Sequence, residues 1–237
     1  MKIAILSDIH SNKQAFDAVY KDIEMQGCEH ILILGDIVGY YYDAEYVVNK
    51  IMSDSRCISI KGNHEAFLLK GLEDESVFRR YKRKYGSGLD IARQQLSEDM
   101  INWIKGLPES KSLRLGGMNI EMHHGSDKDI EEYIYPDESL NRINQIEKKA
   151  EYLFYGHTHY PVSFYNNGFV IVNPGSVGQP RDIGGLASYV ILNIENNSVV
   201  NRRIAFETHS LVKTVELLDA DKPYLKNVLT RNNHLGG

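Results

Sequence analysis

Two pairs of residues with the same spacing suggest metal-binding chemistry. His157 and His159 flank a threonine in the segment YGHTHYPV, and Asp8 and His10 flank an isoleucine in the segment SDIH. Imidazole nitrogens and carboxylate oxygens are common ligands of transition metals. In extended backbone, residues i and i+2 point to the same side, so each pair could present two ligands to one volume. We therefore interpret each pair as part of a chelating set.

Three further polar clusters contain residues of the same chemical types. They follow short apolar runs and read GDIVG (35–39), GNHE (62–65) and HHGS (123–126). Together, the five clusters hold six of the nine histidines, at positions 10, 64, 123, 124, 157 and 159. In an open α/β sheet the loops after the strands converge, so the five clusters could meet in one place. Each alone has an ordinary explanation, such as helix capping by Asn63 or a turn at Asp36. Five coincidences together are a poor explanation of the pattern.

Alternating strands and helices are expected to position these clusters. Apolar runs occur at 2–6, 30–34 and 57–60, with helical patterns at 12–26 and 43–53 and a longer helical stretch from about 64 to 106. This order predicts βαβ units and a largely parallel sheet. Later short runs, punctuated by Gly, Asn and Pro, predict a mixed or antiparallel sheet that is interrupted by a helix at about 137–149. Two amphipathic helices are expected from about residue 208.

Length and composition indicate a single domain over residues 1–237. The net charge of −5 argues against a nucleic-acid coat, so we expect no stable nucleic-acid partner. Apolar runs are too short to span a bilayer and the N-terminus lacks a signal peptide's apolar region, which predicts no membrane partner and a cytoplasmic location. The only cysteines, Cys28 and Cys57, are too few for a disulfide framework.

The order of the motifs resembles that of the calcineurin-like metallophosphoesterase superfamily. Asp-x-His, Gly-Asp, Gly-Asn-His-Glu, His-Gly and Gly-His-x-His follow one another between residues 8 and 159. The segment NPGSVGQPRD at 173–182 is similar to the sequence that follows the last motif in the small bacterial and archaeal phosphoesterase branch, whose members resemble phosphodiesterases or diadenosine tetraphosphatases. The resemblance implies an α/β (α+β) fold, a four-layer sandwich of two mixed β-sheets flanked by helices.

The resemblance also implies a reaction and a set of ligands. The reaction would be hydrolysis of a phosphoester or phosphoanhydride by a metal-bridging hydroxide. One metal ion would be bound by Asp8, His10, Asp36 and His159, and the other by Asp36, Asn63, His124 and His157. His64 would stabilise the transition state or protonate the leaving group, helped by Glu65. An imidazole-rich ligand set suits Mn, Fe, Zn or Co better than Ca or Mg, and we expect Mn to favour activity.

Other residues permit two interpretations each. Arg181 could contact a substrate phosphate bidentately or form a structural ion pair. His123 precedes His124 in a strand, so its side chain should point the other way and not bind metal. The tyrosines at 40–42 are expected to pack on a neighbouring loop, the alternative being stacking on a nucleobase. The basic run at 79–84 is expected to be a solvated helix face, the alternative being a cationic rim that attracts anionic substrates.

The substrate is expected to be a phosphorylated small molecule or a nucleotide. A phosphodiesterase or a nucleotide or dinucleotide-polyphosphate hydrolase is favoured over a serine/threonine protein phosphatase, because the chain lacks obvious long inserts for docking a protein. A non-catalytic metal-binding scaffold is the remaining alternative, since some superfamily members keep the fold but serve as protein-binding subunits. Such proteins generally lose the ligands or the histidine of Gly-Asn-His, and this chain keeps them.

Overall fold

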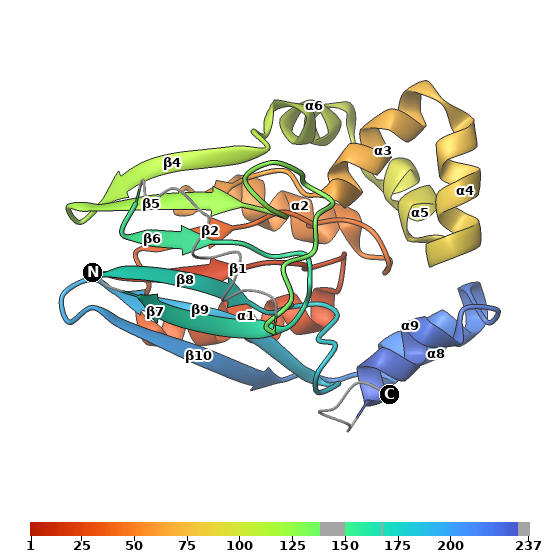
Figure 1. Ribbon diagram of the computed structural model, residues 1–237. Helices are drawn as coiled ribbons and strands as arrows, with labels where there is room; N and C mark the ends of the chain where they lie inside the picture. Colours follow the sequence, from red (N-terminus) through yellow and green to blue (C-terminus); the bar gives the residue numbers. More distant parts are fainter. Residues whose placement is uncertain (138–149, 167, 232–237) are drawn as a thin grey trace.

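Two five-stranded sheets form the centre of the protein (Figure 1). The structure is a computed structural model that describes residues 1–137, 150–166 and 168–231. The first sheet has the order β10-β9-β1-β2-β3. Its strands are β1 (Lys2–Leu6), β2 (His30–Ile33), β3 (Cys57–Ser59), β9 (Leu186–Asn193) and β10 (Ser198–Ala205). The first three pair in parallel, as the βαβ pattern predicted, and β9 pairs antiparallel with β1 and β10.

The second sheet has the order β4-β5-β6-β8-β7. Its strands are β4 (Ser110–Leu115), β5 (Met118–His123), β6 (Tyr152–Phe154), β7 (Pro161–Asn166) and β8 (Phe169–Pro174). The central strands β5, β6 and β8 are parallel, and the edge strands pair antiparallel with them. Both sheets are therefore mixed, which confirms the predicted fold class.

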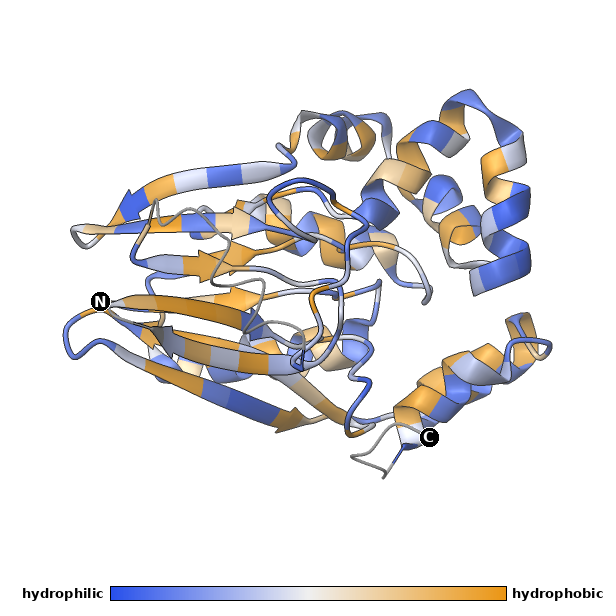
Figure 2. Ribbon diagram, viewed as in Figure 1, coloured by the Kyte–Doolittle hydropathy of each residue, from blue (hydrophilic) through white to orange (hydrophobic). Residues whose placement is uncertain are grey.

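The alternation of side chains along β1 explains how the layers pack. Ile3 and Ile5 pack in a buried cluster with Met122, Phe154 and Val172 of the second sheet, so this face of β1 is covered by that sheet. Ala4 and Leu6 belong to a different cluster, built with the helices that follow. A strand buried on both faces has a continuous apolar sequence, which is why the run KIAIL predicted the strand correctly. Figure 2 shows the same concentration of apolar residues along the central strands.

Eight helices of the described part of the chain flank the sheets. They are α1 (Lys13–Gln26), α2 (Ala44–Ser53), α3 (Asn63–Glu73), α4 (Glu75–Tyr85), α5 (Gly88–Gln95), α6 (Glu98–Gly106), α8 (His209–Leu218) and α9 (Pro223–Asn227), and α9 continues into a short 3₁₀ helix, η1 (Val228–Thr230). The helical stretch predicted from about 64 to 106 is helical over most of its length, and the structure divides it into the four helices α3 to α6. Asp74 caps the start of α4 through Ser76, and Gly86 ends α4 with a φ of 93° that favours glycine.

The C-terminal helices were predicted correctly, and they pack on the segment of three tyrosines. Tyr41 and Tyr42 are buried against Leu211 and Leu225. The Tyr41 hydroxyl donates to the Leu225 carbonyl at 3.1 Å, and the Tyr42 hydroxyl donates to Asp219 at 2.9 Å. These contacts confirm packing for both rings. The helix predicted at 137–149 lies almost wholly outside the described residues. Within the described ranges, no helix has the length and apolarity needed to cross a bilayer.

Candidate metal centre

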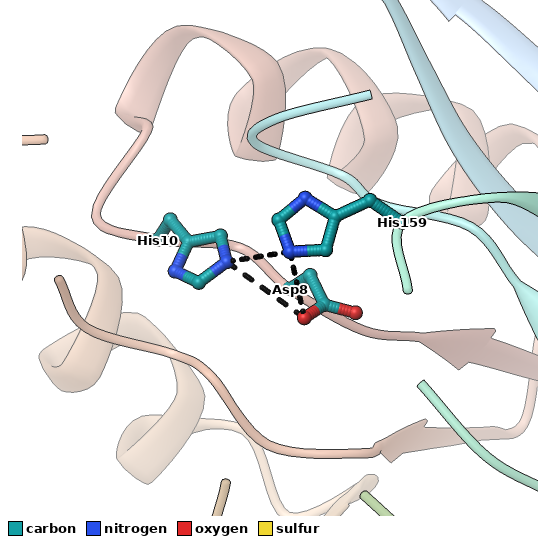
Figure 3. A group of neighbouring side chains, drawn as sticks. All are labelled: Asp8, His10 and His159. Atoms are coloured by element: carbon teal, nitrogen blue, oxygen red, sulfur yellow. Dashed lines mark hydrogen bonds and ion pairs between the residues drawn. The ribbon is translucent and has the colours of Figure 1, made fainter. Parts of the chain in front are cut away.

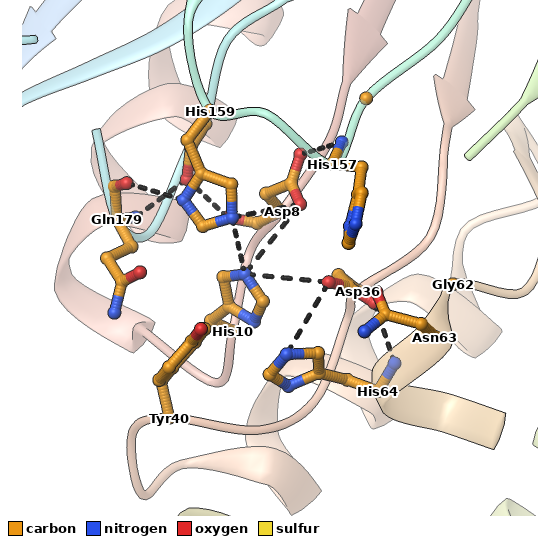
Figure 4. Close-up of polar contacts among 12 residues, drawn as sticks. Asp8, His10, Asp36, Tyr40, Gly62, Asn63, His64, His157, His159 and Gln179 are labelled. Atoms are coloured by element: carbon orange, nitrogen blue, oxygen red, sulfur yellow. Dashed lines mark hydrogen bonds and ion pairs between the residues drawn. The ribbon is translucent and has the colours of Figure 1, made fainter. Parts of the chain in front are cut away.

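The five polar clusters meet beyond the carboxyl ends of β1, β2, β3, β5 and β6. The ligand-type side chains lie in three overlapping groups: Asp8, His10 and His159; His10, Asp36 and His64; and Asp36, His124 and His157. In each group, the possible ligand atoms lie within 4.8 Å of one another. Figure 4 shows most of these side chains converging from different loops. The positions follow from the sheet order, because parallel strands place their following loops at one edge.

The local backbone differs from the predicted extended geometry. The residues concerned have positive φ angles, namely Asp8 (56°), His10 (51°), Asp36 (52°), His157 (67°) and His159 (65°). Left-handed conformations are uncommon for residues other than glycine, and they cluster at functional sites. The prediction that each pair lies in extended backbone, with residues i and i+2 on the same side, was therefore wrong. The side chains nevertheless converge. Tight turns after the strands direct them, held by bonds such as the His10 N–H to the Asp36 carbonyl at 2.9 Å.

The first group points three acceptor atoms at one another (Figure 3). Nε2 of His159 lies 3.1 Å from Nε2 of His10 and 3.2 Å from Oδ1 of Asp8. Nδ1 of His10 faces the Val38 carbonyl at 3.3 Å, and Nδ1 of His159 faces the Gln179 carbonyl at 2.7 Å. Those carbonyls accept the Nδ1 protons of neutral rings, which leaves both Nε2 lone pairs aimed at the centre, as in metal-ligating histidines.

Asp8 supplies independent evidence that these residues fit a cation. Its Oδ1 is buried and has no hydrogen-bond partner among the described residues, whereas Oδ2 accepts the His157 backbone N–H at 3.1 Å. An unpaired buried carboxylate oxygen is costly. The loop that makes this contact comes close because of Gly156, where a Cβ atom would lie 2.0 Å from the Ser7 hydroxyl. A divalent cation fits the free oxygen and the two adjacent lone pairs.

The group of Asp36, His124 and His157 is built in the same way around Asp36. Nε2 of His124 lies 3.3 Å from Oδ2 of Asp36, while its Nδ1 lies 2.7 Å from the Leu34 carbonyl. The side-chain amide of Asn63 lies 3.0 Å from His124 Nε2 and also faces Nδ1 of His157 and the Asp36 carboxylate. Nε2 of His10 also lies 3.7 Å from Asp36 Oδ2, so this carboxylate stands between the two groups. Its place fits the bridging position that the resemblance implied.

Electrostatics keep most of these groups in the protonation states that metal ligands need. Burial lowers the pKa of His157 to about 4, with a further contribution from His124. Burial likewise lowers the pKa of His10 and His159. Burial alone would raise the pKa of Asp36, but nearby histidines, first His124, hold it well below its usual range. Neutral imidazoles and ionised carboxylates are the binding forms.

His124 is the exception in the absence of metal. Burial lowers its pKa, but the charge of Asp36 and a hydrogen bond to it outweigh burial and raise the pKa to about 9. Protonated His124 thus supplies a positive charge beside the Asp36 carboxylate. Metal binding would displace this proton, since a ligating imidazole is neutral.

Comparison with known proteins identifies the family. The sequence model of one protein family, the calcineurin-like phosphoesterase superfamily domain, matches residues 1–197. The chain belongs to this superfamily. An uncharacterised protein of Methanocaldococcus jannaschii is 30% identical over 86% of this chain and 88% of its own length. Phosphodiesterase YfcE of Escherichia coli is 26% identical over 92% of this chain and 98% of its own length.

Solved structures agree with the family assignment. A metallophosphoesterase from Sphaerobacter thermophilus superposes with a TM-score of 0.76 at 27% identity, covering 97% of this chain and 98% of the other. A hypothetical protein from Pyrococcus horikoshii OT3 has a TM-score of 0.85 at 19% identity and covers 98% of both chains, which supports the fold. The chain is therefore a metal-dependent phosphoester hydrolase by family, as the order of its motifs predicted.

In this phosphoesterase, His64 belongs to the group with His10 and Asp36 and to neither of the other two groups. It follows Asn63 in the first turn of α3, and its backbone N–H donates to Oδ1 of Asp36 at 2.9 Å. Its Nε2 lies 3.8 Å from Asp36 Oδ2, and its Nδ1 lies 2.9 Å from the Tyr81 hydroxyl. Burial, and then repulsion from His124, lower its pKa to about 4, although Asp36 opposes the shift. Gly39 is required beside it, because a Cβ there would lie 2.1 Å from Nδ1.

Glu65 makes contacts of a different kind from those predicted. Its carboxylate accepts backbone N–H groups of Asp36 and Gly62, both at 2.8 Å, and of Val38 at 2.9 Å. Burial, and then the charge of Asp36, raise its pKa to about 7. Glu65 joins the loop after β2 to the start of α3. These contacts favour a structural role over the predicted assistance to His64.

Arg181 lies next to the first group in a surrounding of hydroxyl and carbonyl oxygens. Its Nε is 3.3 Å from the Tyr224 hydroxyl, and its Nη1 is 3.5 Å from the Thr158 carbonyl. No described carboxylate pairs with it, so the structural ion pair is not formed within the described ranges. His123 lies outside the three groups, with Nε2 3.8 Å from Glu121.

Two tyrosines shape this centre in ways that the sequence did not predict. Tyr40, for which the sequence left packing and nucleobase stacking open, has its ring centroid 4.5 Å from that of His10 and 4.7 Å from that of His64, and so it forms a wall of the site. Tyr81 holds His64 from the basic run of α4. Tyr40 follows the segment GDIVG directly, which was a usable signal. Tyr81 had no local signal, because its partner is 17 residues away on another helix.

Proposed function

We propose that this chain is a dinuclear-metal-dependent phosphohydrolase, acting as a phosphodiesterase or as a nucleotide or dinucleotide-polyphosphate hydrolase. The observation that supports it most is that two groups of possible metal-ligand atoms meet at Asp36. Two divalent transition metal ions suit this imidazole-rich set, with Mn, Fe, Zn or Co as candidates and Mn favoured for activity. When bound, they would activate water at neutral pH and neutralise charge on the phosphoryl oxygens. The similarity to phosphodiesterase YfcE supports a diester substrate.

The proposed ligands are divided as the family resemblance suggests. One ion would be held by Asp8, His10, Asp36 and His159, and the other by Asp36, Asn63, His124 and His157. The hydrogen bonds from the far ring nitrogens to carbonyls fix the orientation of the histidines. Such contacts set which nitrogen faces a metal, and they raise its basicity.

His64 would donate a hydrogen bond to the leaving oxygen and so stabilise its charge in the transition state. The Tyr81 hydroxyl accepts the Tyr40 backbone N–H at 3.2 Å, and its own proton can then point to Nδ1 of His64. That arrangement places the single proton of the neutral ring on Nε2, the nitrogen that faces Asp36 and the centre. A positioned hydrogen-bond donor of this kind contributes about 10²–10³-fold to turnover.

Arg181 would bind a nonbridging phosphate oxygen of the substrate. Its guanidinium lacks a carboxylate partner among the described residues and lies close enough to His159 to lower the pKa of that ring, after burial. An arginine in this state offers charge-assisted, bidentate hydrogen bonds to phosphate.

A substrate panel tests the proposed function. Manganese-loaded protein is assayed with bis-p-nitrophenyl phosphate, p-nitrophenyl phosphate, dinucleotide polyphosphates and a phosphopeptide. We expect the diester or the dinucleotide polyphosphates to be hydrolysed fastest. Fastest hydrolysis of the phosphopeptide would favour a protein phosphatase, and a metal-loaded protein inert towards all four would favour a scaffold.

The role of His64 has its own test. His64→Ala should keep the metal content and lower turnover of a diester with a poor leaving group by about a hundredfold or more. His209→Ala removes an exposed histidine of α8 and serves as the control. Unchanged turnover in His64→Ala would refute the role.

A further inference from the structure

A pocket of about 310 Å³ opens beside His64, between α3 and α4. Its walls include Phe67, Tyr81 and Tyr85. The same three rings surround His64, with ring centroids 6.1, 5.4 and 6.0 Å from that of the imidazole. The pocket and the metal centre therefore share a wall of aromatic rings. This volume is at the lower end of the range of small-molecule sites.

The charged residues of the pocket are mostly cationic. Lys70, Arg80 and Lys84 line it, and Glu131 is the only acidic residue of the lining within the described ranges. The lining thus carries a formal charge of +2, from three cations less one anion, in a chain whose net charge is −5. Within the described residues, none of the three cations forms an ion pair, whereas Lys82 of the same helix pairs with Asp90 at 3.2 Å.

The basic run divides according to the pocket. Arg79, Arg80, Arg83 and Lys84 are all exposed, as the prediction of a solvated helix face expected. Arg80 and Lys84 lie one helical turn apart and line the pocket, whereas Arg79 and Arg83 are not part of the described lining. The alternative interpretation, a cationic rim, therefore concerns only Arg80 and Lys84.

We propose that this pocket binds the leaving part of the substrate, and that this part is a nucleoside phosphate. The proposal rests on the proposed function, because His64 would donate a hydrogen bond to the leaving oxygen at the shared wall. Aromatic rings stack on nucleobases. They also attract cations, and Nζ of Lys84 lies 4.7 Å from the centroid of the Tyr85 ring. Unpaired lysine and arginine side chains bind phosphate. A base with a phosphate satisfies both features of the lining.

Binding to the metal-free protein tests the pocket independently of catalysis. Isothermal titration calorimetry with AMP, adenosine and inorganic phosphate should show AMP binding about tenfold or more tightly than either fragment. The variant Arg80→Ala/Lys84→Ala should lose about tenfold or more in AMP affinity. Arg79→Ala/Arg83→Ala makes the same charge change on the same helix and should stay within about twofold of the parent.

Three results would overturn the proposal. They are no AMP binding by the metal-free protein, equal affinity for AMP and inorganic phosphate, and equal loss of AMP affinity in the two double variants. The last result would indicate attraction by the net charge alone.

Kinetics separate this proposal from the proposed function. In manganese-loaded enzyme, Arg80→Ala/Lys84→Ala should raise KM for a dinucleotide polyphosphate about tenfold and leave kcat/KM for bis-p-nitrophenyl phosphate within about twofold. Equal losses on both substrates would contradict a leaving-group pocket. If the parent enzyme hydrolyses neither compound, the proposed function fails, and AMP binding still decides whether the pocket takes a nucleotide.

Discussion

The hydroxyl of Tyr81 lies 2.9 Å from Nδ1 of His64 and accepts the backbone N–H of Tyr40 at 3.2 Å. This single oxygen therefore joins α4 to His64 and to the loop after β2. A hydrogen bond at Nδ1 selects which ring nitrogen carries the proton. Tyr81 is thus a positioning residue for the proposed hydrogen bond from His64 to the leaving oxygen.

Tyr81→Phe should weaken the hydrogen bond from His64 to the leaving oxygen. We expect kcat to fall about tenfold for a phenyl diester, whose leaving oxygen is the more basic and gains more from a hydrogen bond, and to change little for the matched p-nitrophenyl diester. Steady-state kinetics on the two substrates measure the difference. Tyr46→Phe, which removes an exposed hydroxyl bonded to Asp17, is the control. Equal losses on both diesters would point to a merely structural effect.

Glu65→Ala should destabilise the fold because three buried N–H groups would lose their acceptor. Each unsatisfied buried donor costs about 1–3 kcal/mol, so we expect a loss of about 3 kcal/mol in the free energy of unfolding. Urea denaturation measures it. Glu73→Ala, at an exposed position of α3, should change stability by less than about 0.5 kcal/mol. Unchanged stability with lost turnover would instead support the catalytic role that the sequence suggested.

Asp22 should make stability depend on pH through its contacts with Arg202 and Tyr189. Burial raises the pKa of Asp22, but the hydrogen bonds from these two partners outweigh it, so the pKa lies below 3.8. A carboxyl whose pKa is lower in the folded state stabilises above the unfolded pKa, and the contribution is lost as pH falls through the folded pKa.

Asp22→Asn should therefore cost about 1–3 kcal/mol near neutral pH, and the difference from the parent should shrink below about pH 4. Denaturation curves at several pH values measure it. Asp17→Asn breaks a surface pair with Lys50 and should cost under about 1 kcal/mol. A difference that grows as pH falls would contradict the assigned sign.

Arg181→Ala should weaken substrate binding without unfolding the protein. We expect KM for a phosphodiester to rise about tenfold, with Arg181→Lys intermediate because it keeps the charge and loses the planar fork. Steady-state kinetics and thermal melts measure both effects. Arg114→Ala on the exposed strand β4 is the control. An unchanged KM would show that Arg181 does not contact the substrate.

The elements predicted best are those whose signal is local. The run KIAIL is apolar throughout because β1 is buried on both faces, and Gly27 ends α1 in a left-handed conformation. The ligand set could be proposed because each cluster directly follows a strand. The breaks between α3 and α6 were also local, at Asp74 and Gly86, but the apolar periodicity alone did not reveal them.

What the sequence did not predict depends on contacts between distant segments. The positive φ angles of Asp8 and His10 are held by bonds to the Gly35 and Asp36 carbonyls, which no i, i+2 pattern reports. The capping role of Glu65 needs the loop after β2 beside α3. The pocket near His64 exists only because α4 folds back against α3.

Metal content at the cluster tests the central claim most directly. Elemental analysis of manganese-saturated protein, with anomalous diffraction to locate the ions, should find two ions per chain, one on each side of Asp36. His209→Ala should match the parent, and His159→Ala should retain about one ion, since a lost ligand costs most at its own site. Protein that binds no manganese there at saturation, or binds it only elsewhere, would contradict a dinuclear centre.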